Sequence, residues 1–286
     1  MRDLKYLGYF ENLLREANNE LIVQAKKDGK VCVAFVCENT PEPLMNLDGT
    51  FSIRLSAPNT GSMDIATYYM SNYTCEFARA LVERGIEGGY QFLDAMIGVD
   101  ACSMMNRAME HFEILKVNEK PNFFVTHCDI PYKITDYTLD SYVKQMRIHV
   151  LDKLTEVYGV DTSDAAIRQA VAEHNEVCSI ISEMAEMRKA ENPVITGYEF
   201  HVINLVSQVC PHYLIKPYLE ETLEELKTRE PEEKFPFRAR VVLVGSEVDD
   251  PEFTKLIETC GAMVVADRYC FGSFPSREQI EILPGE

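Results

Sequence analysis

The sequence lacks any run of apolar residues that approaches the ~18 needed to cross a membrane. Its first twenty residues, MRDLKYLGYFENLLREANNE, contain no apolar segment of the kind that marks a secretion signal and are typical of an amphipathic helix. Internal repeats and low-complexity tracts are also missing. We therefore expect a globular, cytoplasmic protein.

Basic residues are scarce, with 28 Lys and Arg against 46 Asp and Glu and a formal net charge of -18. A surface of this charge repels phosphate backbones and anionic lipid head groups. We therefore expect neither nucleic acid nor a membrane surface as a partner. An anionic small molecule needs a local group of Lys or Arg, which composition does not locate.

The nine cysteines include no CxxC pair. An odd number of cysteines, scattered through a long chain without a secretion signal, does not describe a disulfide framework. We expect reduced thiols, some of which bind metal or line the core.

Alternating strands and helices fill the first part of the chain. Apolar, β-branched runs predict four strands, at residues 31–37, 51–55, 92–98 and 123–126. Helical patterns lie near residues 3–28, 75–86 and 102–114. Strands that alternate with helices predict a parallel, doubly wound sheet.

The pattern changes to nearly uninterrupted helix after residue 135. Four helices are predicted, at residues 137–158, 163–189, 197–209 and 211–226. A strand at 239–245, a helix at 251–260 and a strand at 262–266 follow.

We predict an α/β protein with two Rossmann-like lobes, parallel sheets and a helical insertion. The N-terminal lobe is expected at residues 1–134, and residues 135–286 hold the helical segment and a C-terminal lobe. That second lobe is expected to be incomplete, because two strands are fewer than an open sheet usually has.

Three cysteines occupy similar positions in this scheme. Cys102 and Cys270 each follow a predicted strand, and Cys75 opens a predicted helix. Ligands bind beyond the carboxyl ends of strands in open α/β sheets, and helix N-termini stabilise thiolates. Three thiolates at a cleft between lobes suit an iron-sulfur site. The alternative is that these lone cysteines pack as small core residues.

Other candidates carry less chemistry. Three further cysteines lie on or at the end of apolar helices and are expected in the core: Cys178, Cys210 and Cys260. Cys128, beside His127, is expected to be structural, with the roles of fourth ligand or pocket residue as alternatives. Glu38 and Asn39 follow the first strand, and we expect one or the other to face the cleft, with a simply solvated loop as the alternative.

Four sequence runs occur in a characteristic order: CENTPE at 37–42, CEFAR at 75–79, DACSM at 100–104 and GAMVVADRYCFGS at 261–273. In these runs the chain resembles the D-component family of 2-hydroxyglutaryl-CoA dehydratase, which includes benzoyl-CoA reductase subunits. The resemblance extends over most of the chain. It departs from the family at Ser103, where Asp is frequent, and family members usually continue well past the third cysteine.

The resemblance implies a 4Fe-4S cluster on Cys75, Cys102 and Cys270, with the fourth iron left to water or to the substrate. It further implies an oxygen-sensitive subunit of a radical (R)-2-hydroxyacyl-CoA dehydratase, a lyase. The implied partners are a homologous second subunit, which forms a heterodimer with this chain, an ATP-dependent iron-sulfur activator protein and an acyl-CoA substrate. One electron converts the thioester to a ketyl radical, which expels the 2-hydroxyl group.

A radical route is needed because the β-hydrogen of such a thioester is hardly acidic. A general base alone accelerates proton removal by only ~10²–10⁴-fold. Two alternatives stay open. The first is a benzoyl-CoA-reductase-type or double-cluster reductase, and the second is a subunit that only relays electrons or supports assembly. The sequence does not specify the acyl group.

Overall fold

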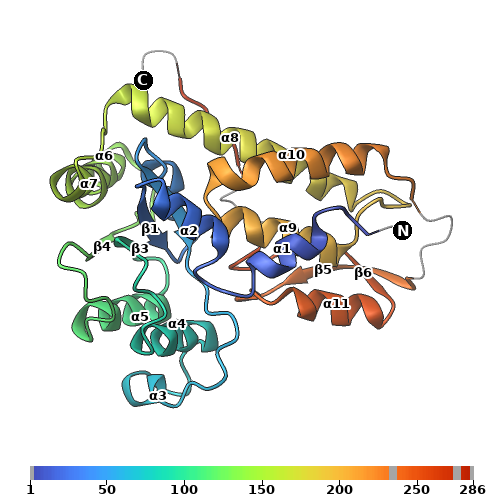
Figure 1. The fold of residues 1–286 in the computed structure, drawn as a ribbon, viewed down its shortest axis with the longest axis horizontal. Helices are drawn as coiled ribbons and strands as arrows, with labels where there is room; N and C mark the ends of the chain where they lie inside the picture. The colour runs from blue at the N-terminus through green and yellow to red at the C-terminus, as the bar shows by residue number, and fades with distance from the viewer. Residues whose placement is uncertain (1–2, 232–236, 273–277, 284–286) are drawn as a thin grey trace. The chain divides into compact units, whose positions relative to one another are not determined.

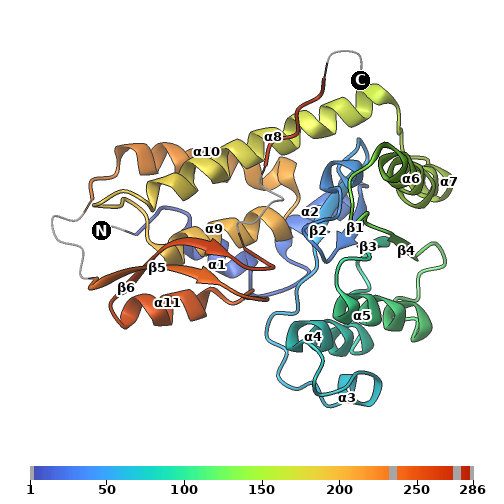
Figure 2. The same cartoon turned by 180° about the vertical axis from the view of Figure 1, so that it is seen from behind.

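The computed structural model describes residues 3–231, 237–272 and 278–283. The chain divides into two compact units, shown from opposite sides in Figures 1 and 2. The first unit comprises Glu16–Ala170, and the second comprises Met1–Arg15 and Val171–Glu286. The chain thus passes between units at residues 15/16 and 170/171, whereas the sequence suggested a boundary after residue 134.

The first unit is built on a four-stranded parallel sheet. Its strands are β1 (Val31–Phe35), β2 (Thr50–Arg54), β3 (Ala95–Val99) and β4 (Phe124–Cys128), in the order β2-β1-β3-β4. The strands β2 and β3 are buried throughout, as is typical of parallel strands that are covered on both faces. The four predicted strands and their parallel arrangement are confirmed.

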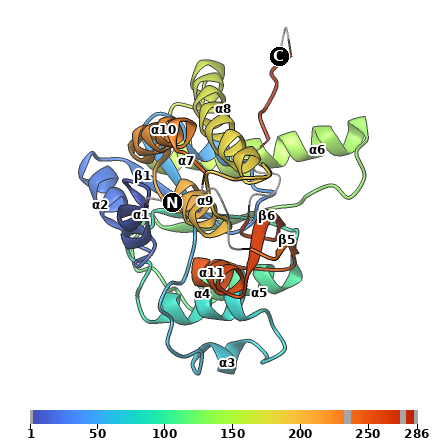
Figure 3. The same ribbon diagram turned by 90° about the vertical axis from the view of Figure 1, so that its right-hand side faces the viewer.

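Seven further elements surround this sheet. They are α2 (Glu20–Lys27), α3 (Ala66–Tyr69), α4 (Glu76–Ile86), α5 (Ser103–Ile114), α6 (Asp136–Met146), α7 (Asp152–Tyr158) and the 3₁₀ turn η1 (Glu42–Met45). A π-helical turn, η2 (Arg147–Leu151), joins α6 to α7. Met146 is the buried residue of α6, and this helix extends to the right of the other helices of its unit in Figure 3.

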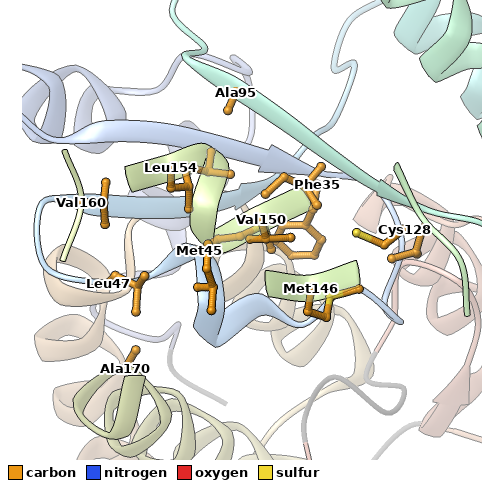
Figure 4. Close-up of a cluster of buried hydrophobic side chains, with 14 of the residues drawn as sticks. Phe35, Met45, Leu47, Ala95, Cys128, Met146, Val150, Leu154, Val160 and Ala170 are labelled. Atoms are coloured by element: carbon orange, nitrogen blue, oxygen red, sulfur yellow. The ribbon is translucent and has the colours of Figure 1, made fainter. Parts of the chain in front are cut away.

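One face of the sheet carries the hydrophobic core of this unit. Side chains from β1 and β3 meet side chains from η1, α6, η2 and α7, as Figure 4 shows. Val33, Phe35 and Ile97 are less than 5% exposed. Residues alternate between the faces of a strand, so the neighbouring Gly98 of β3 lies on the opposite face. The ideal Cβ position at Gly98 overlaps Met109 of α5, so α5 covers that opposite face.

The prediction of one helix over residues 3–28 is wrong. The structure has two helices, α1 (Leu7–Leu13) in the second unit and α2 in the first. Asn19 separates them, because its side chain accepts hydrogen bonds from the backbone N–H groups of Leu21 and Ile22 at 3.1 and 3.2 Å. This N-cap starts a new helix, which hydrophobic periodicity alone did not reveal.

The second unit contains a two-stranded parallel sheet. Its other elements are α8 (Asp164–Met187), which crosses the boundary, α9 (Gly197–Val209), α10 (His212–Thr228), β5 (Ala239–Val244), α11 (Pro251–Thr259) and β6 (Ala262–Arg268). Both α9 and α11 pack against β6, as can be followed in Figure 2. Nearly every residue of α9 is buried, so this helix forms the centre of the unit.

Candidate functional site

The carboxyl edge of the four-stranded sheet is the place where polar side chains and cysteines of the first unit gather. All four strands are parallel, so the segments that follow them leave from one edge. These segments begin at residues 36, 55, 100 and 129. They lead to Cys75 and Cys102, two of the three cysteines singled out by the sequence.

Cys75 and Cys102 are the N-cap residues of α4 and α5. Cys75 is half-buried and Cys102 is exposed. In the described structure neither side chain forms a capping hydrogen bond to its helix. The unpaired N–H groups and the dipole of a helix N-terminus stabilise a negatively charged sulfur. Both sulfurs therefore lie where helix N–H groups are left without intrahelical partners.

The helices α4 and α5 lie side by side and run in the same direction. Near their C-terminal ends, the ideal Cβ position at Gly85 of α4 lies 3.4 Å from the Phe112 ring of α5. The other ends of both helices therefore point to the carboxyl edge of the sheet. Cys75 and Cys102 stand at the N-terminal ends of these two neighbouring helices, and their joint role as ligands stays a prediction.

The loop that carries Cys102 is fixed by hydrogen bonds. The backbone N–H of Asp100 donates to the carbonyl oxygen of Cys128 at 2.9 Å, and the side-chain amide of Asn106 donates to the Asp100 carboxylate. The N–H of Asn106 also donates to the Cys102 carbonyl oxygen at 2.9 Å. The loop is therefore tied to the next strand and to the first turn of α5.

Arg54 is a buried charge at the same edge that the sequence analysis missed. It ends β2, is 1% exposed, and places Nη2 3.5 Å from Oε2 of Glu38. Next to this pair, the side-chain amide of Asn39 donates to the sulfur of Cys37 at 3.6 Å. A lone basic residue at the end of an apolar strand was the available signal. Whether Glu38 and Asn39 face a cleft stays a prediction.

Cys270 belongs to the second unit, whereas Cys75 and Cys102 belong to the first. It lies in a turn directly after β6 and is half-buried. Its backbone N–H donates to the carbonyl oxygen of Ser246 at 3.0 Å, which extends the pairing of β5 and β6 to the turn. Cys270 therefore follows the carboxyl end of β6, as predicted. Ser273, the last residue of its sequence run, lies outside the described residues.

Most of the remaining cysteines are core residues. Those buried are Cys32, Cys37, Cys128, Cys178 and Cys210. Burial raises the pKa of Cys32 and Cys37, and raises that of Cys128 to about 11. A thiol of this kind stays protonated at neutral pH and is a poor ligand.

The prediction that Cys260 lies in the core is wrong. This residue is exposed at the C-cap of α11, past Thr254, the buried residue of that helix. The three predicted ligands and Cys260 are thus the cysteines that solvent reaches.

The described residues contain no preformed metal site. Within residues 3–231, 237–272 and 278–283, no three His, Cys, Asp or Glu side chains converge to hold a metal ion. Over the same ranges, no helix combines the length and the apolar character that a membrane span requires.

Comparison with known proteins places the chain in a family. The family model for the 2-hydroxyglutaryl-CoA dehydratase D-component matches residues 37–285. The beta subunit of (R)-phenyllactyl-CoA dehydratase from Clostridium sporogenes is 17% identical over 92% of this chain and 68% of its own length. A subunit of benzoyl-CoA reductase from Thauera aromatica is 20% identical over 83% of this chain and 61% of its own length.

A third relative extends the same pattern. The beta subunit of (R)-2-hydroxyglutaryl-CoA dehydratase from Acidaminococcus fermentans is 20% identical over 88% of this chain and 65% of its own length. The chain spans about two thirds of the length of these relatives. It belongs to the 2-hydroxyglutaryl-CoA dehydratase D-component family.

Proposed function

We propose that this chain is a subunit of an (R)-2-hydroxyacyl-CoA dehydratase that holds a 4Fe-4S cluster through Cys75, Cys102 and Cys270. The observation that carries the proposal is the accessibility of these three thiols in a chain whose other cysteines, Cys260 apart, are buried. Family membership supports the class of reaction. Relatives named as beta subunits support a second subunit as partner.

The donor set fits the proposed group. Thiolates are soft ligands that suit iron-sulfur clusters, and three protein ligands leave one iron position open for a substrate oxygen. When bound, such a cluster supplies one electron at a time to an acyl thioester. We further propose that an ATP-dependent activator protein provides this electron and that the electron is recovered after water is lost.

The chain's own residues would contribute position and charge stabilisation. Cys75 and Cys102 stand at the N-termini of α4 and α5, where the unpaired N–H groups and the dipole of each helix would stabilise the negative charge of a bound cluster. The hydrogen bonds of Asp100 and Asn106 hold the Cys102 loop in place. Because the net charge of -18 repels an anionic thioester, its binding needs a local cation.

A reductase is the second candidate. The benzoyl-CoA reductase subunit matches this chain at a level of identity similar to that of the dehydratase subunits. The same ligand set would then deliver electrons to a substrate that loses no water. A subunit that only relays electrons is the third candidate.

Anaerobic purification with iron and sulfide analysis tests the ligand set. We expect about four irons in the wild-type chain and a loss of most iron in Cys102→Ala, because only two of the three proposed protein ligands remain to hold the cluster. Cys260→Ala is the matched control, since it removes an equally accessible thiol from outside the set. A wild-type chain without iron, or a Cys102→Ala variant that keeps it, refutes the proposal.

An activity assay separates the candidates. The chain, with its partner subunit, activator and ATP, is given a panel of acyl-CoA thioesters. An unsaturated acyl-CoA formed with loss of water identifies a dehydratase, and a reduced acyl-CoA identifies a reductase. The same assay is repeated with a Cys75→Ala variant of this chain and an unchanged partner subunit. Turnover that persists in this complex contradicts a direct role of this chain in the reaction.

A further inference from the structure

The turn that carries Cys270 is closed by backbone hydrogen bonds. The N–H of Gly272 donates to the carbonyl oxygen of Tyr269 at 3.0 Å, which makes Cys270 and Phe271 the two central residues of the turn. The N–H of Cys270 donates across to the carbonyl oxygen of Ser246 at 3.0 Å. The backbone of the turn is thus joined to both β5 and β6.

The side chains of the turn are divided between core and surface. Tyr269 is 4% exposed and Phe271 is fully buried, whereas Cys270 between them is half-buried. The Tyr269 ring lies 5.5 Å from the ring of the buried His201. Two buried side chains on either side of Cys270 fix the backbone at this residue and therefore the direction of its Cα–Cβ bond.

A buried ion pair lies directly beneath the turn. The Asp267 carboxylate accepts a hydrogen bond from Nη1 of Arg188 at 3.0 Å, and both side chains are 3% exposed. The guanidinium carbon of Arg188 lies 3.7 Å from the centre of the Phe200 ring. Two charges taken so far from solvent depend on each other, so the end of β6 is held to Arg188, directly after α8, and through Arg188 to Phe200 of α9.

Gly272 packs closely against the Asp267 carboxylate of this ion pair. An ideal Cβ there would lie 2.6 Å from Oδ1 of Asp267 and 2.8 Å from Cδ2 of Tyr269, so only glycine permits the contact. The side-chain amide of Gln208, on α9, donates to the carbonyl oxygen of Gly272 at 3.3 Å. The turn is therefore fastened from below by Asp267 and from α9 by Gln208.

We propose that Arg188, Gln208 and Gly272 are positioning residues that hold the turn so that the Cys270 sulfur is presented in one fixed direction. The inference rests on the proposed function, because it concerns a ligand of the proposed cluster. The inference goes beyond the proposed function, because it assigns the positioning of this ligand to buried contacts within the second unit. The Cys270 position then exists before any iron binds.

The first test uses the full chain without iron and measures the rate at which iodoacetamide alkylates Cys270, by peptide mass spectrometry. Gln208→Met removes the hydrogen bond to the Gly272 carbonyl oxygen, together with the 3.4 Å hydrogen bond to the Asn204 carbonyl oxygen within α9, and we expect alkylation of Cys270 to become about fivefold faster as the released turn is populated. Gly272→Ala is expected to give a larger increase. Cys260, exposed in the same unit, is the internal reference, and its rate stays constant.

Gly245→Ala is the matched control for Gly272→Ala. It lies in the same unit, and an ideal Cβ there meets no atom of the described structure within 4 Å. Its Cys270 rate is expected to equal that of the wild type. If Gly272→Ala fails to fold, Gln208→Met decides the question alone. Cys270 rates that are equal in wild type and Gln208→Met overturn the inference.

The second test measures the electron paramagnetic resonance spectrum of the reduced, iron-loaded chain. We expect Gln208→Met to shift the g-values or broaden the signal, because one sulfur takes several directions, and Gly245→Ala to leave the spectrum unchanged. A spectrum in Gln208→Met that is identical to the wild type contradicts the inference. A wild-type chain that takes up no iron refutes the proposed function, and the alkylation rates then decide the inference separately.

Discussion

Gly197→Ala probes a close contact between α9 and β6 in the second unit. Gly197 is the first residue of α9, where its N–H donates to Oε1 of Glu258 at 2.8 Å. An ideal Cβ at this position lies 2.6 Å from Cβ of Val264 and 2.7 Å from its carbonyl oxygen in β6. The Cβ has no rotamer and the strand backbone does not yield, so the start of α9 must move away from β6.

The expected cost follows from these contacts. Overpacking costs about 1–3 kcal/mol, and stretching the hydrogen bond to Glu258 costs about 1 kcal/mol more. We therefore expect the free energy of unfolding to fall by roughly 2–4 kcal/mol. Urea denaturation followed by circular dichroism measures the change, provided that the m-value is unchanged.

Gly8→Ala supplies the control within the same unit. Gly8 lies in α1, and an ideal Cβ there meets no described atom within 4 Å. Alanine is the better helix former, so this variant is expected to be as stable as the wild type or more stable by up to about 1 kcal/mol. The packing argument is refuted if Gly197→Ala unfolds within about 0.5 kcal/mol of the wild type.

Three other substitutions test buried ionisable groups. Asp94→Asn should destabilise the first unit by about 2–3 kcal/mol in urea titrations, because two lysines and the Cys32 N–H donate to its carboxylate; an unchanged midpoint contradicts this. Arg229→Met should cost about 3–5 kcal/mol by the same measurement, because it leaves the buried Glu199 carboxylate, now 2.8 and 3.0 Å from the guanidinium, unpaired; a loss under 1 kcal/mol would show that water replaces the pair. Burial lowers the pKa of His201 from 6.5 to about 4, so the unfolded chain alone takes up this proton as the pH falls from 6.5 to 4. The contribution of neutral His201 to the free energy of unfolding is therefore complete above pH 6.5 and is lost as the pH falls towards 4. Between pH 7 and pH 5, the free energy of unfolding of His201→Gln should fall by less than that of the wild type.

Much of the fold could be predicted because the apolar pattern is regular. The strands β1 to β4 were placed within a few residues, since runs of β-branched residues bounded by turns have few other structures available. The break between α1 and α2 was missed because it depends on one capping side chain, Asn19. Hydrophobic periodicity continues across such a cap and does not show it.

The positions of the three candidate cysteines relative to strands and helices could be predicted from the order of elements along the chain. Their exposure depends on packing and could not. Each of Cys75, Cys102 and Cys270 stands at a helix start or a strand end, which the sequence indicates directly. Burial separated these thiols from the five in the core, and it corrected the expectation for Cys260.

The sequence by itself determined the α/β class, the order of the strands along the chain and the family resemblance, because these depend on local patterns and on motif order. The tertiary structure alone decided that Arg54 is buried beside Glu38 and that Arg188 and Asp267 pair beneath the Cys270 turn. Arg188 and Asp267 are 79 residues apart, and no local pattern links two charges at that separation. Their pairing results from the packing of whole helices and strands, which excludes water from both charges at once.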